Sequence, residues 1–208
     1  MHCTVKICGI TSVEDADWVL QSGADAIGIN LIPSSKRYVD LIQARAIAER
    51  TRGKLLTVAV VADPTPESAV LLQRELAVDY LQLHGNESVE LVSRLSVPAF
   101  KAVRIGSLAD VEAAKAFPGD LLLADAKVEG ALGGTGASFD WSLATSLARS
   151  RRLIVAGGLT PHNVAQAIEV LRPWGVDVAS GVEDPGNARK KSPGRITELV
   201  AAVRRATQ

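Results

Sequence analysis

Cysteine, histidine and long apolar runs are all scarce in this chain of 208 residues. The two cysteines, Cys3 and Cys8, lie an odd number of positions apart on one expected strand, so their side chains face opposite sides and cannot pair with each other. The three histidines are not accompanied by a cluster of further ligands, and we expect no metal. These scarcities exclude a disulfide framework and a zinc-binding pattern.

Two further absences concern the partners of the protein. The apolar runs are only as long as strands and the amino terminus has no secretory signal, so we expect no membrane partner and a cytoplasmic location. Lys and Arg balance Asp and Glu at 23 each, so no net positive field would attract nucleic acid. No Gly-x-Gly-x-x-Gly dinucleotide motif is present, and we expect no cofactor. A small molecule bound at a local site is the expected partner.

Short apolar runs alternate with amphipathic stretches along the whole chain, a pattern that is typical of βα units and a parallel sheet. With 47% apolar residues, the chain can bury one sizeable core. Eight runs use nearly all of it, which predicts a single (β/α)8 (TIM) barrel over residues 1–208, whereas a flavodoxin-like open sheet needs only about five strands. The runs cover residues 4–8, 26–31, 55–61, 80–84, 99–104, 121–125, 153–156 and 176–179.

Several residues between the runs predict where helices begin. Thr11 with Glu14 forms a possible capping box, and Thr65 and Thr160 each precede a proline suited to the first helical turn. After the sixth run, the next helix is expected only near Asp140. The last helix should bury one face, because its apolar residues follow the i, i+3, i+4, i+7 spacing: Ile196, Leu199, Val200 and Val203.

Small-residue turns at the ends of the last two strands predict a phosphate site. The first turn contains Gly157 and Gly158, and the second contains Ser180 and Gly181. Glycines let backbone N–H groups approach an anion, and the loops after strands seven and eight are the usual phosphate site of barrels. The alternative is that these glycines only form tight turns. The recurrence of such a turn at both strands favours phosphate.

Cys8 ends the first strand on the same face as Lys6, opposite the apolar Val5 and Ile7, so we expect it to point into the barrel. A buried cysteine is more often an inert core residue. Here the neighbouring cation would favour the thiolate, the form that can accept a proton. Lys6 itself needs a compensating charge, and Asp177 on the eighth strand is the candidate partner.

Asp125 ends the sixth strand after an apolar run, where a carboxylate is costly unless it is exposed or paired. A cap or turn role is possible, but the next helix begins much later. The intervening loop is the longest in the chain and could close over a substrate, since it contains Gly130, Gly133, Gly134 and Gly136. We therefore expect Asp125 to act in proton transfer.

Two residues on other loops of the same end are further candidates. Most surface arginines are only solvated, but Arg37 could bind a carboxylate through two parallel hydrogen bonds. His84 ends the fourth strand and forms a His-x-x-Glu pair with Glu87. Because a metal would need further ligands, we expect His84 to order the barrel mouth.

The segment KICGIT at 6–11 resembles the opening motif of phosphoribosylanthranilate isomerases, and other segments are similar to that family's motifs in the same order. They are SKRYV at 35–39, QLHG at 82–85, GGTG at 133–136 with FDW at 139–141, AGGL at 156–159 with Asn163, GVDV at 175–178 and SGVE at 180–183. The resemblance spans nearly the whole chain. Leu31, Ala59 and Val61 depart from it, at positions expected around the aromatic ring of the substrate.

This resemblance implies an isomerase of tryptophan biosynthesis that needs neither metal nor redox cofactor. It would convert N-(5-phosphoribosyl)anthranilate to its 1-deoxyribulose phosphate isomer by an Amadori rearrangement, with general acid and base catalysis. Cys8 would be the general base, Asp125 the general acid, and Arg37 would hold the anthranilate carboxylate. The phosphate would bind at the two turns described above, against Gly157, Gly158, Ser180 and Gly181.

Other phosphate-binding barrels are alternatives. A pentose-phosphate epimerase would need metal-ligating histidines and carboxylates, and an indole-glycerol-phosphate synthase usually has a longer chain with a catalytic lysine and glutamates. A non-catalytic barrel that retains only the phosphate site is also compatible with the fold. An apolar helix face looks the same in sequence whether it packs on the barrel or on a partner chain; of the two states, we expect a monomer rather than a homodimer.

Overall fold

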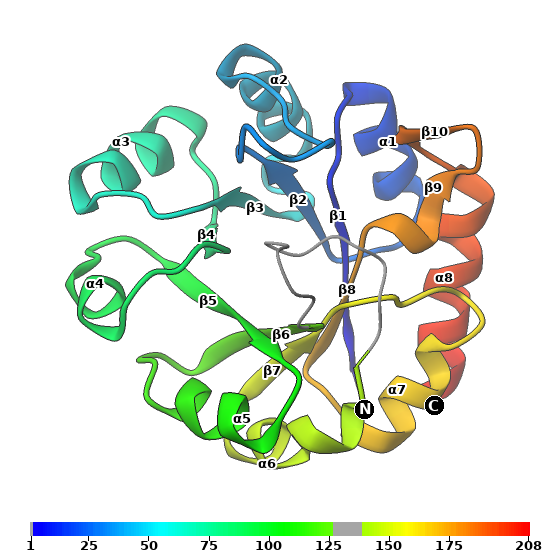
Figure 1. Ribbon diagram of the computed structural model, residues 1–208. Helices are drawn as coiled ribbons and strands as arrows, with labels where there is room; N and C mark the ends of the chain where they lie inside the picture. Colours follow the sequence, from blue (N-terminus) through cyan, green and yellow to red (C-terminus); the bar gives the residue numbers. More distant parts are fainter. Residues whose placement is uncertain (1, 127–138) are drawn as a thin grey trace.

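The computed structural model describes residues 2–126 and 139–208, which form a closed barrel of eight parallel strands ringed by helices (Figure 1). Each strand pairs with the next along the chain, and β1 pairs with β8 to close the sheet. The predicted (β/α)8 barrel is therefore confirmed. Its strands are β1 Thr4–Cys8, β2 Ala26–Asn30, β3 Leu56–Val61, β4 Tyr80–Leu83, β5 Ala99–Ile105, β6 Leu121–Ala126, β7 Arg152–Val155 and β8 Gly175–Val178.

Helices cover the outside of the barrel, and a small hairpin follows β8 (Figure 1). The α-helices are α1 Val13–Ser22, α2 Leu41–Thr51, α3 Pro66–Leu76, α4 Val89–Arg94, α5 Leu108–Lys115, α6 Thr145–Ser150, α7 Val164–Leu171 and α8 Pro193–Ala206. Two 3-10 helices, η1 Trp141–Ala144 and η2 Ser180–Val182, precede α6 and the hairpin. The hairpin pairs β9 Glu183–Asp184 with β10 Asn187–Lys191 in antiparallel fashion.

Apolar side chains fill both faces of the strands. Val5 and Ile7 of β1 are fully buried in the main core, which lies between the strands and the helices. Phe100 and Leu123 belong to a second cluster, inside the barrel. The helix face predicted on α8 is buried in the main core, through Ile196, Leu199, Val200 and Val203. The alternation of β1 thus leaves its polar face directed inward, as expected.

The beginning of α1 differs from the prediction. Ser12, not Thr11, is the N-cap, because its side chain accepts the backbone N–H of Asp15 at 3.0 Å. Thr11 lies one residue earlier and donates its hydroxyl to the carbonyl of Arg189 instead. A contact between segments far apart in sequence has taken the residue that the local pattern assigned to the cap.

Of the other three predicted helix starts, two are confirmed and one is wrong. Thr65 is the N-cap of α3, with Pro66 in the first turn, and Asp140 is the N-cap of η1. The expected start at Thr160 is wrong, because its carbonyl closes a turn with the N–H groups of Asn163 and Val164, so α7 begins only afterwards. The expected closing loop lies outside the described residues, with Gly130, Gly133, Gly134 and Gly136.

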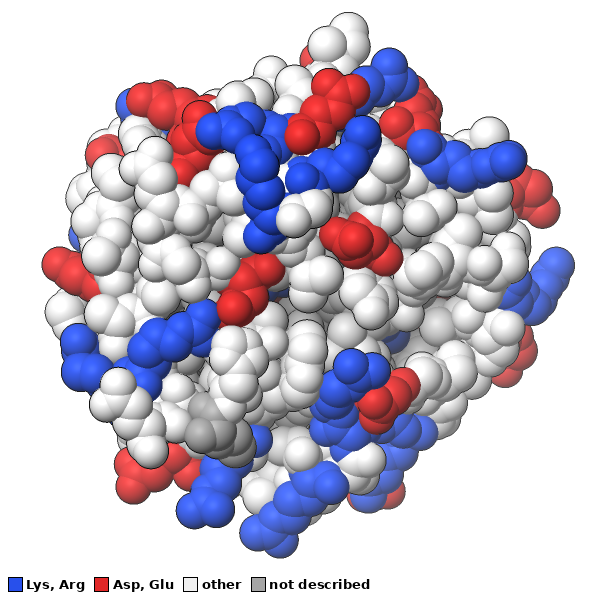
Figure 2. Space-filling view, turned by 180° about the vertical axis from the view of Figure 1, so that it is seen from behind, with Lys and Arg blue, Asp and Glu red and all other residues white. Residues whose placement is uncertain are grey.

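Charged side chains of both signs surround the face shown in Figure 2, and apolar and neutral residues occupy much of its centre. This distribution agrees with the balanced charge of the chain. Within the described part of the chain, no helix is both long enough and apolar enough to cross a membrane.

Candidate active site

A cavity of about 540 Å³ opens where the loops after the barrel strands meet. In barrels of this type, the carboxyl ends of the strands carry the chemistry. The cavity is lined by six of the predicted site residues: Cys8, Arg37, Asp125, Gly157, Gly158 and Ser180. Gly181 lines a second cavity of about 310 Å³, which shares Gly158 and Ser180 with the first. The fold therefore brings the predicted residues to one end of the barrel.

Cys8 lies above a buried ion pair inside the barrel. The ammonium group of Lys6 is 2.9 Å from Oδ1 of Asp177, so the predicted partner is confirmed. Gly28, beside Cys8 on β2, leaves the space that the thiol needs, because a Cβ atom there would lie 2.7 Å from the sulfur. The barrel interior thus holds Cys8 in a narrow, charged environment.

Lys6 favours the thiolate of Cys8, as expected, but other effects outweigh it in the unliganded protein. Burial raises the pKa of the Cys8 thiol, and the negative charge of Asp177 raises it further. Lys6 and Lys191 lower the pKa, but by less than burial and Asp177 raise it. Burial together with Asp177 therefore favours the neutral thiol of Cys8 over the thiolate.

Asp125 lies near the end of β6, is buried, and lines the same cavity as Cys8. Its Oδ1 atom accepts the backbone N–H of Ala126 at 2.8 Å, and its Oδ2 atom lies 3.5 Å from Nε2 of His84. The other ring nitrogen of His84 is 2.9 Å from Nε2 of Gln82. His84 therefore orders the barrel mouth, as expected, and does so beside the carboxyl group of Asp125.

Arg37 is 4% exposed and lies along the cavity wall. Its Nε atom donates a hydrogen bond to Oε1 of Glu183, while its Nη2 atom is buried and has no hydrogen-bond partner among the described residues. A buried donor without a partner is costly, so it is well placed for an acceptor that a ligand would bring. Gly9 permits this position, since a Cβ atom there would lie 2.3 Å from Cδ of Arg37.

The two glycine turns pack directly on each other. Gly157 and Gly158 adopt φ angles of 87° and 62°, in the left-handed region that favours glycine. At Gly181, a Cβ atom would lie 2.0 Å from the carbonyl oxygen of Leu159. Asn163 fixes the first turn, because its Nδ2 atom donates to the carbonyl of Gly158 at 2.9 Å. The close approach brings backbone groups of both loops to the shared edge of the two cavities.

The β9–β10 hairpin contains residues that the sequence did not identify as part of the site. Glu183, within the SGVE motif, is buried against Arg37, and Lys191 is 1% exposed with its ammonium 3.6 Å from Oε1 of Glu183. Burial lowers the pKa of Lys191 to about 8, although Glu183 acts in the opposite direction. Only the motif itself could have indicated Glu183; Lys191 sits in a polar run that looks solvated.

The His84–Glu87 pair is not arranged as a pair of metal ligands. The carboxylate of Glu87 accepts the backbone N–H groups of Asp63 and Gly85, and it pairs with Lys101 at 2.9 Å. Within residues 2–126 and 139–208, no three His, Cys, Asp or Glu side chains are grouped in a way that could hold a metal ion.

A match to a family model shows to which family the chain belongs. The family model described as N-(5'-phosphoribosyl)anthranilate (PRA) isomerase matches residues 5–202. The chain belongs to this family. An N-(5'-phosphoribosyl)anthranilate isomerase of Rubrobacter xylanophilus is 42% identical over 96% of this chain and 98% of its own length. One of Myxococcus xanthus is 44% identical over 89% of this chain and 90% of its own. Membership decides against the epimerase and synthase alternatives.

Solved structures of PRA isomerases superpose on the whole barrel. The isomerase of Thermotoga maritima matches with a TM-score of 0.87 and 36% identity, over 98% of this chain and 99% of its own. An isomerase solved in complex with reduced 1-(o-carboxyphenylamino)-1-deoxyribulose 5-phosphate matches with a TM-score of 0.85 and 34% identity, over the same shares of the two chains. A further match is described as monomers generated from the dimeric Thermotoga maritima enzyme, at 34% identity and a TM-score of 0.84, over the same shares again.

Proposed function

We propose that the chain converts N-(5'-phosphoribosyl)anthranilate to 1-(2-carboxyphenylamino)-1-deoxyribulose 5-phosphate in tryptophan biosynthesis, with Cys8 as general base and Asp125 as general acid. The observation that carries the proposal is the lining of one cavity by a thiol, a carboxyl group, an arginine and two glycine turns. These are two groups for proton transfer and two for anion binding. The substrate has the matching features, a sugar between a phosphate and a carboxylate.

The two anionic ends of the substrate have separate partners in this proposal. The phosphate binds at the turns of Gly157–Gly158 and Ser180–Gly181, where backbone N–H groups can approach it. The anthranilate carboxylate binds the guanidinium of Arg37, whose buried Nη2 donor is available. With both ends held, the ribose lies in the part of the cavity lined by Cys8 and Asp125.

The reaction then needs one proton donated and one removed. Asp125 protonates the ring oxygen of the furanose as the C1–O bond breaks, which gives an open-chain iminium ion. Cys8 removes the proton from C2, and the resulting enolamine tautomerises to the ketone. Because burial and Asp177 raise the pKa of the Cys8 thiol, only a small fraction of the unliganded protein carries the thiolate that would act as the base.

The proposal is tested with Cys8→Ser and Asp125→Asn. Serine keeps the size of cysteine but ionises far above neutral pH, and asparagine keeps the shape of aspartate without a transferable proton. Each change should lower kcat by about 10² to 10⁴. Binding of the reduced product analogue, measured by calorimetry, should survive in both variants. A variant that binds normally and still turns over at the wild-type rate would remove that residue from the mechanism.

A growth test separates an active isomerase from a barrel that only binds phosphate. Expression of the chain in a tryptophan auxotroph that lacks the isomerase should restore growth, and expression of the Cys8→Ser variant should not.

We also propose that residues 1–208 form one domain that acts as a monomer in the cytoplasm. Light scattering on the purified protein would measure the oligomeric state.

A further inference from the structure

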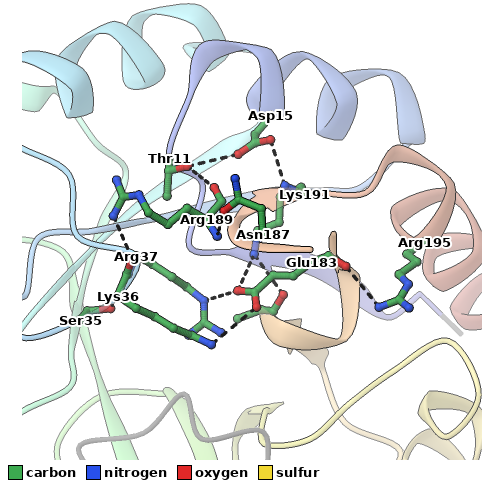
Figure 3. Close-up of polar contacts among 11 residues, drawn as sticks. Thr11, Asp15, Ser35, Lys36, Arg37, Glu183, Asn187, Arg189, Lys191 and Arg195 are labelled. Carbon is green, nitrogen blue, oxygen red and sulfur yellow. Dashed lines mark hydrogen bonds and ion pairs between the residues drawn. The ribbon is translucent and has the colours of Figure 1, made fainter. Parts of the chain in front are cut away.

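The β9–β10 hairpin reaches from η2 across to the loops that follow β1 and β2 (Figure 3). Its contacts converge on the segment around Arg37, although more than a hundred residues separate the two in sequence. The proposed reaction gives the hairpin no role. Its side chains are nevertheless arranged around the one arginine that the reaction assigns to the substrate carboxylate.

Glu183 holds the side chain of Arg37. Glu183 is 6% exposed, and its carboxylate accepts a hydrogen bond from Nε of the guanidinium, which fixes one edge of that planar group. Two ammonium groups lie farther from the same carboxylate, that of Lys191 at 3.6 Å and that of Lys36 at 3.8 Å. The closest cation to Glu183 is therefore Arg37, whose buried Nη2 atom has no hydrogen-bond partner among the described residues.

Arg189 holds the backbone on both sides of Arg37. Its Nη1 atom donates to the carbonyl oxygens of Lys36, at 2.8 Å, and Tyr38, at 3.1 Å. Its own carbonyl accepts the hydroxyl of Thr11, which ties this strand of the hairpin to the loop after β1 (Figure 3). One hairpin thus fixes both the main chain and the side chain at position 37.

The hairpin is itself anchored at its end. The backbone N–H of Lys191 donates to Oδ1 of Asp15 at 3.1 Å, and its ammonium donates to the carbonyl of Ala179 at 3.0 Å. Ala179 directly precedes the turn of Ser180 and Gly181. The anchor therefore connects the support of Arg37 to the loop that carries the expected phosphate site.

We propose that Glu183 and Arg189 are positioning residues that hold the Nη edge of Arg37 toward the carboxylate of the substrate. The inference rests on the proposed function, because it assumes that Arg37 binds that carboxylate. An arginine fixed in advance loses less side-chain freedom on binding than a mobile one, so its contribution to affinity is larger. The hairpin then determines specificity for a ring that carries a carboxyl group.

The test compares two ligands that differ only in the carboxyl group. They are the reduced product analogue, which carries it, and the corresponding anilino compound, which lacks it. The ratio of their Kd values isolates what Arg37 contributes. Glu183→Gln should lower this ratio about tenfold, the effect expected when one long side chain must be ordered on binding. Arg189→Met should lower it by about threefold, and kcat at saturation should change little in both.

The direction of the effect separates positioning from simple charge. Removing the negative charge of Glu183 would by itself strengthen binding of an anionic ligand, so a weaker preference for the carboxylated analogue must come from a misplaced Arg37. In an Arg37→Lys background, Glu183→Gln should have little further effect on the ratio, because the residue through which it acts is gone.

Lys190→Met is the matched control. Lys190 lies on the same hairpin, but its ammonium faces Glu14 at 3.7 Å and the ring of Trp18, away from Arg37, so the ratio should not change. If Glu183→Gln and Arg189→Met keep the wild-type ratio while Arg37→Lys loses it, the positioning role is wrong and the role of Arg37 stands. If the wild-type protein has no preference between the analogues, the role of Arg37 fails, and the positioning role with it.

Discussion

The barrel interior below Cys8 and the hairpin beside it both bury a lysine against a carboxylate, but they do so differently. In the interior, Lys6 and Asp177 form a pair at 2.9 Å. Burial lowers the pKa of Lys6, but Asp177 and Cys8 raise it more, so the net shift is upward. In the hairpin, Lys191 is 3.6 Å from a carboxylate that also binds Arg37, and burial lowers its pKa to about 8.

The difference lies in how the charges balance. The interior pair has one cation for one anion, so the two charges cancel and the pair has no net charge to attract a ligand. In the hairpin cluster, the carboxylate of Glu183 is shared by three cations, which are Arg37, Lys191 and Lys36. The first arrangement suits the stability of the barrel, and the second suits the binding of an anionic substrate. Three substitutions of lysine by methionine test this distinction.

The largest effect on stability is expected for Lys6→Met. Asp177 would remain buried without its cation, and breaking a buried pair in this way costs about 3–5 kcal/mol of the free energy of unfolding. Urea denaturation would measure the loss. The double variant Lys6→Met with Asp177→Leu should recover most of it, because it leaves no uncompensated charge. A loss below about 1 kcal/mol in the single variant would show that Asp177 does not depend on Lys6 to compensate its charge.

A smaller effect is expected for Lys191→Met, about 1 kcal/mol or less at pH 7, because Glu183 keeps Arg37 as a partner. The pH dependence should be more informative. The folded pKa of Lys191, about 8, lies below the ordinary 10.5, so between these values the unfolded chain binds more protons. The free energy of unfolding should therefore rise with pH in this window, by at most about 1.4 kcal/mol per unit.

The measurement is the difference between wild type and Lys191→Met in urea denaturation from pH 7 to pH 9. The difference is needed because the thiols act in the opposite sense at higher pH. The pKa of Cys3 is raised to about 11, so the unfolded chain loses that proton first and stability falls above about pH 9. Parallel curves for the two proteins would contradict a lysine with a lowered pKa.

The smallest effect is expected for Lys36→Met. The side chain of Lys36 is 53% exposed and its ammonium is 3.8 Å from Glu183. Exposed pairs of this kind contribute roughly 0.5 kcal/mol or less. The difference in the free energy of unfolding between wild type and Lys36→Met should be small or absent in urea denaturation, at low salt and at high salt alike. A larger loss than that of Lys191→Met would reverse the order on which the comparison depends.

Most of the barrel could be predicted because each of its strands is a local pattern. The alternation of β1 correctly predicted that Lys6 points inward. Asp177 could be proposed as its partner because a closed barrel brings β8 alongside β1. The errors were at helix starts. Thr11 has the right residue type for a cap, but it contacts Arg189, and such a distant contact leaves no local signal.

The candidate site divides in the same way. Cys8, Asp125 and the glycine turns end strands, so the fold class alone assigns them to one end of the barrel. The raised pKa of the Cys8 thiol could not be predicted, because it depends first on how completely the thiol is buried and then on how far Asp177 offsets Lys6. The support of Arg37 by Glu183 was also missed. These two residues are separated by 146 positions, and the hairpin reads as a polar surface segment.

The pairing of β1 with β8 has a consequence for biosynthesis. Lys6 is synthesised before Asp177, which follows 171 residues later. At about 5–20 residues per second, this interval is on the order of 10 to 35 s. During that time Lys6 lacks Asp177, the carboxylate with which it pairs, and β1 lacks the neighbouring strand β8. The nascent chain therefore cannot complete the lining of the cavity until translation has passed β8, however early the first strands collapse.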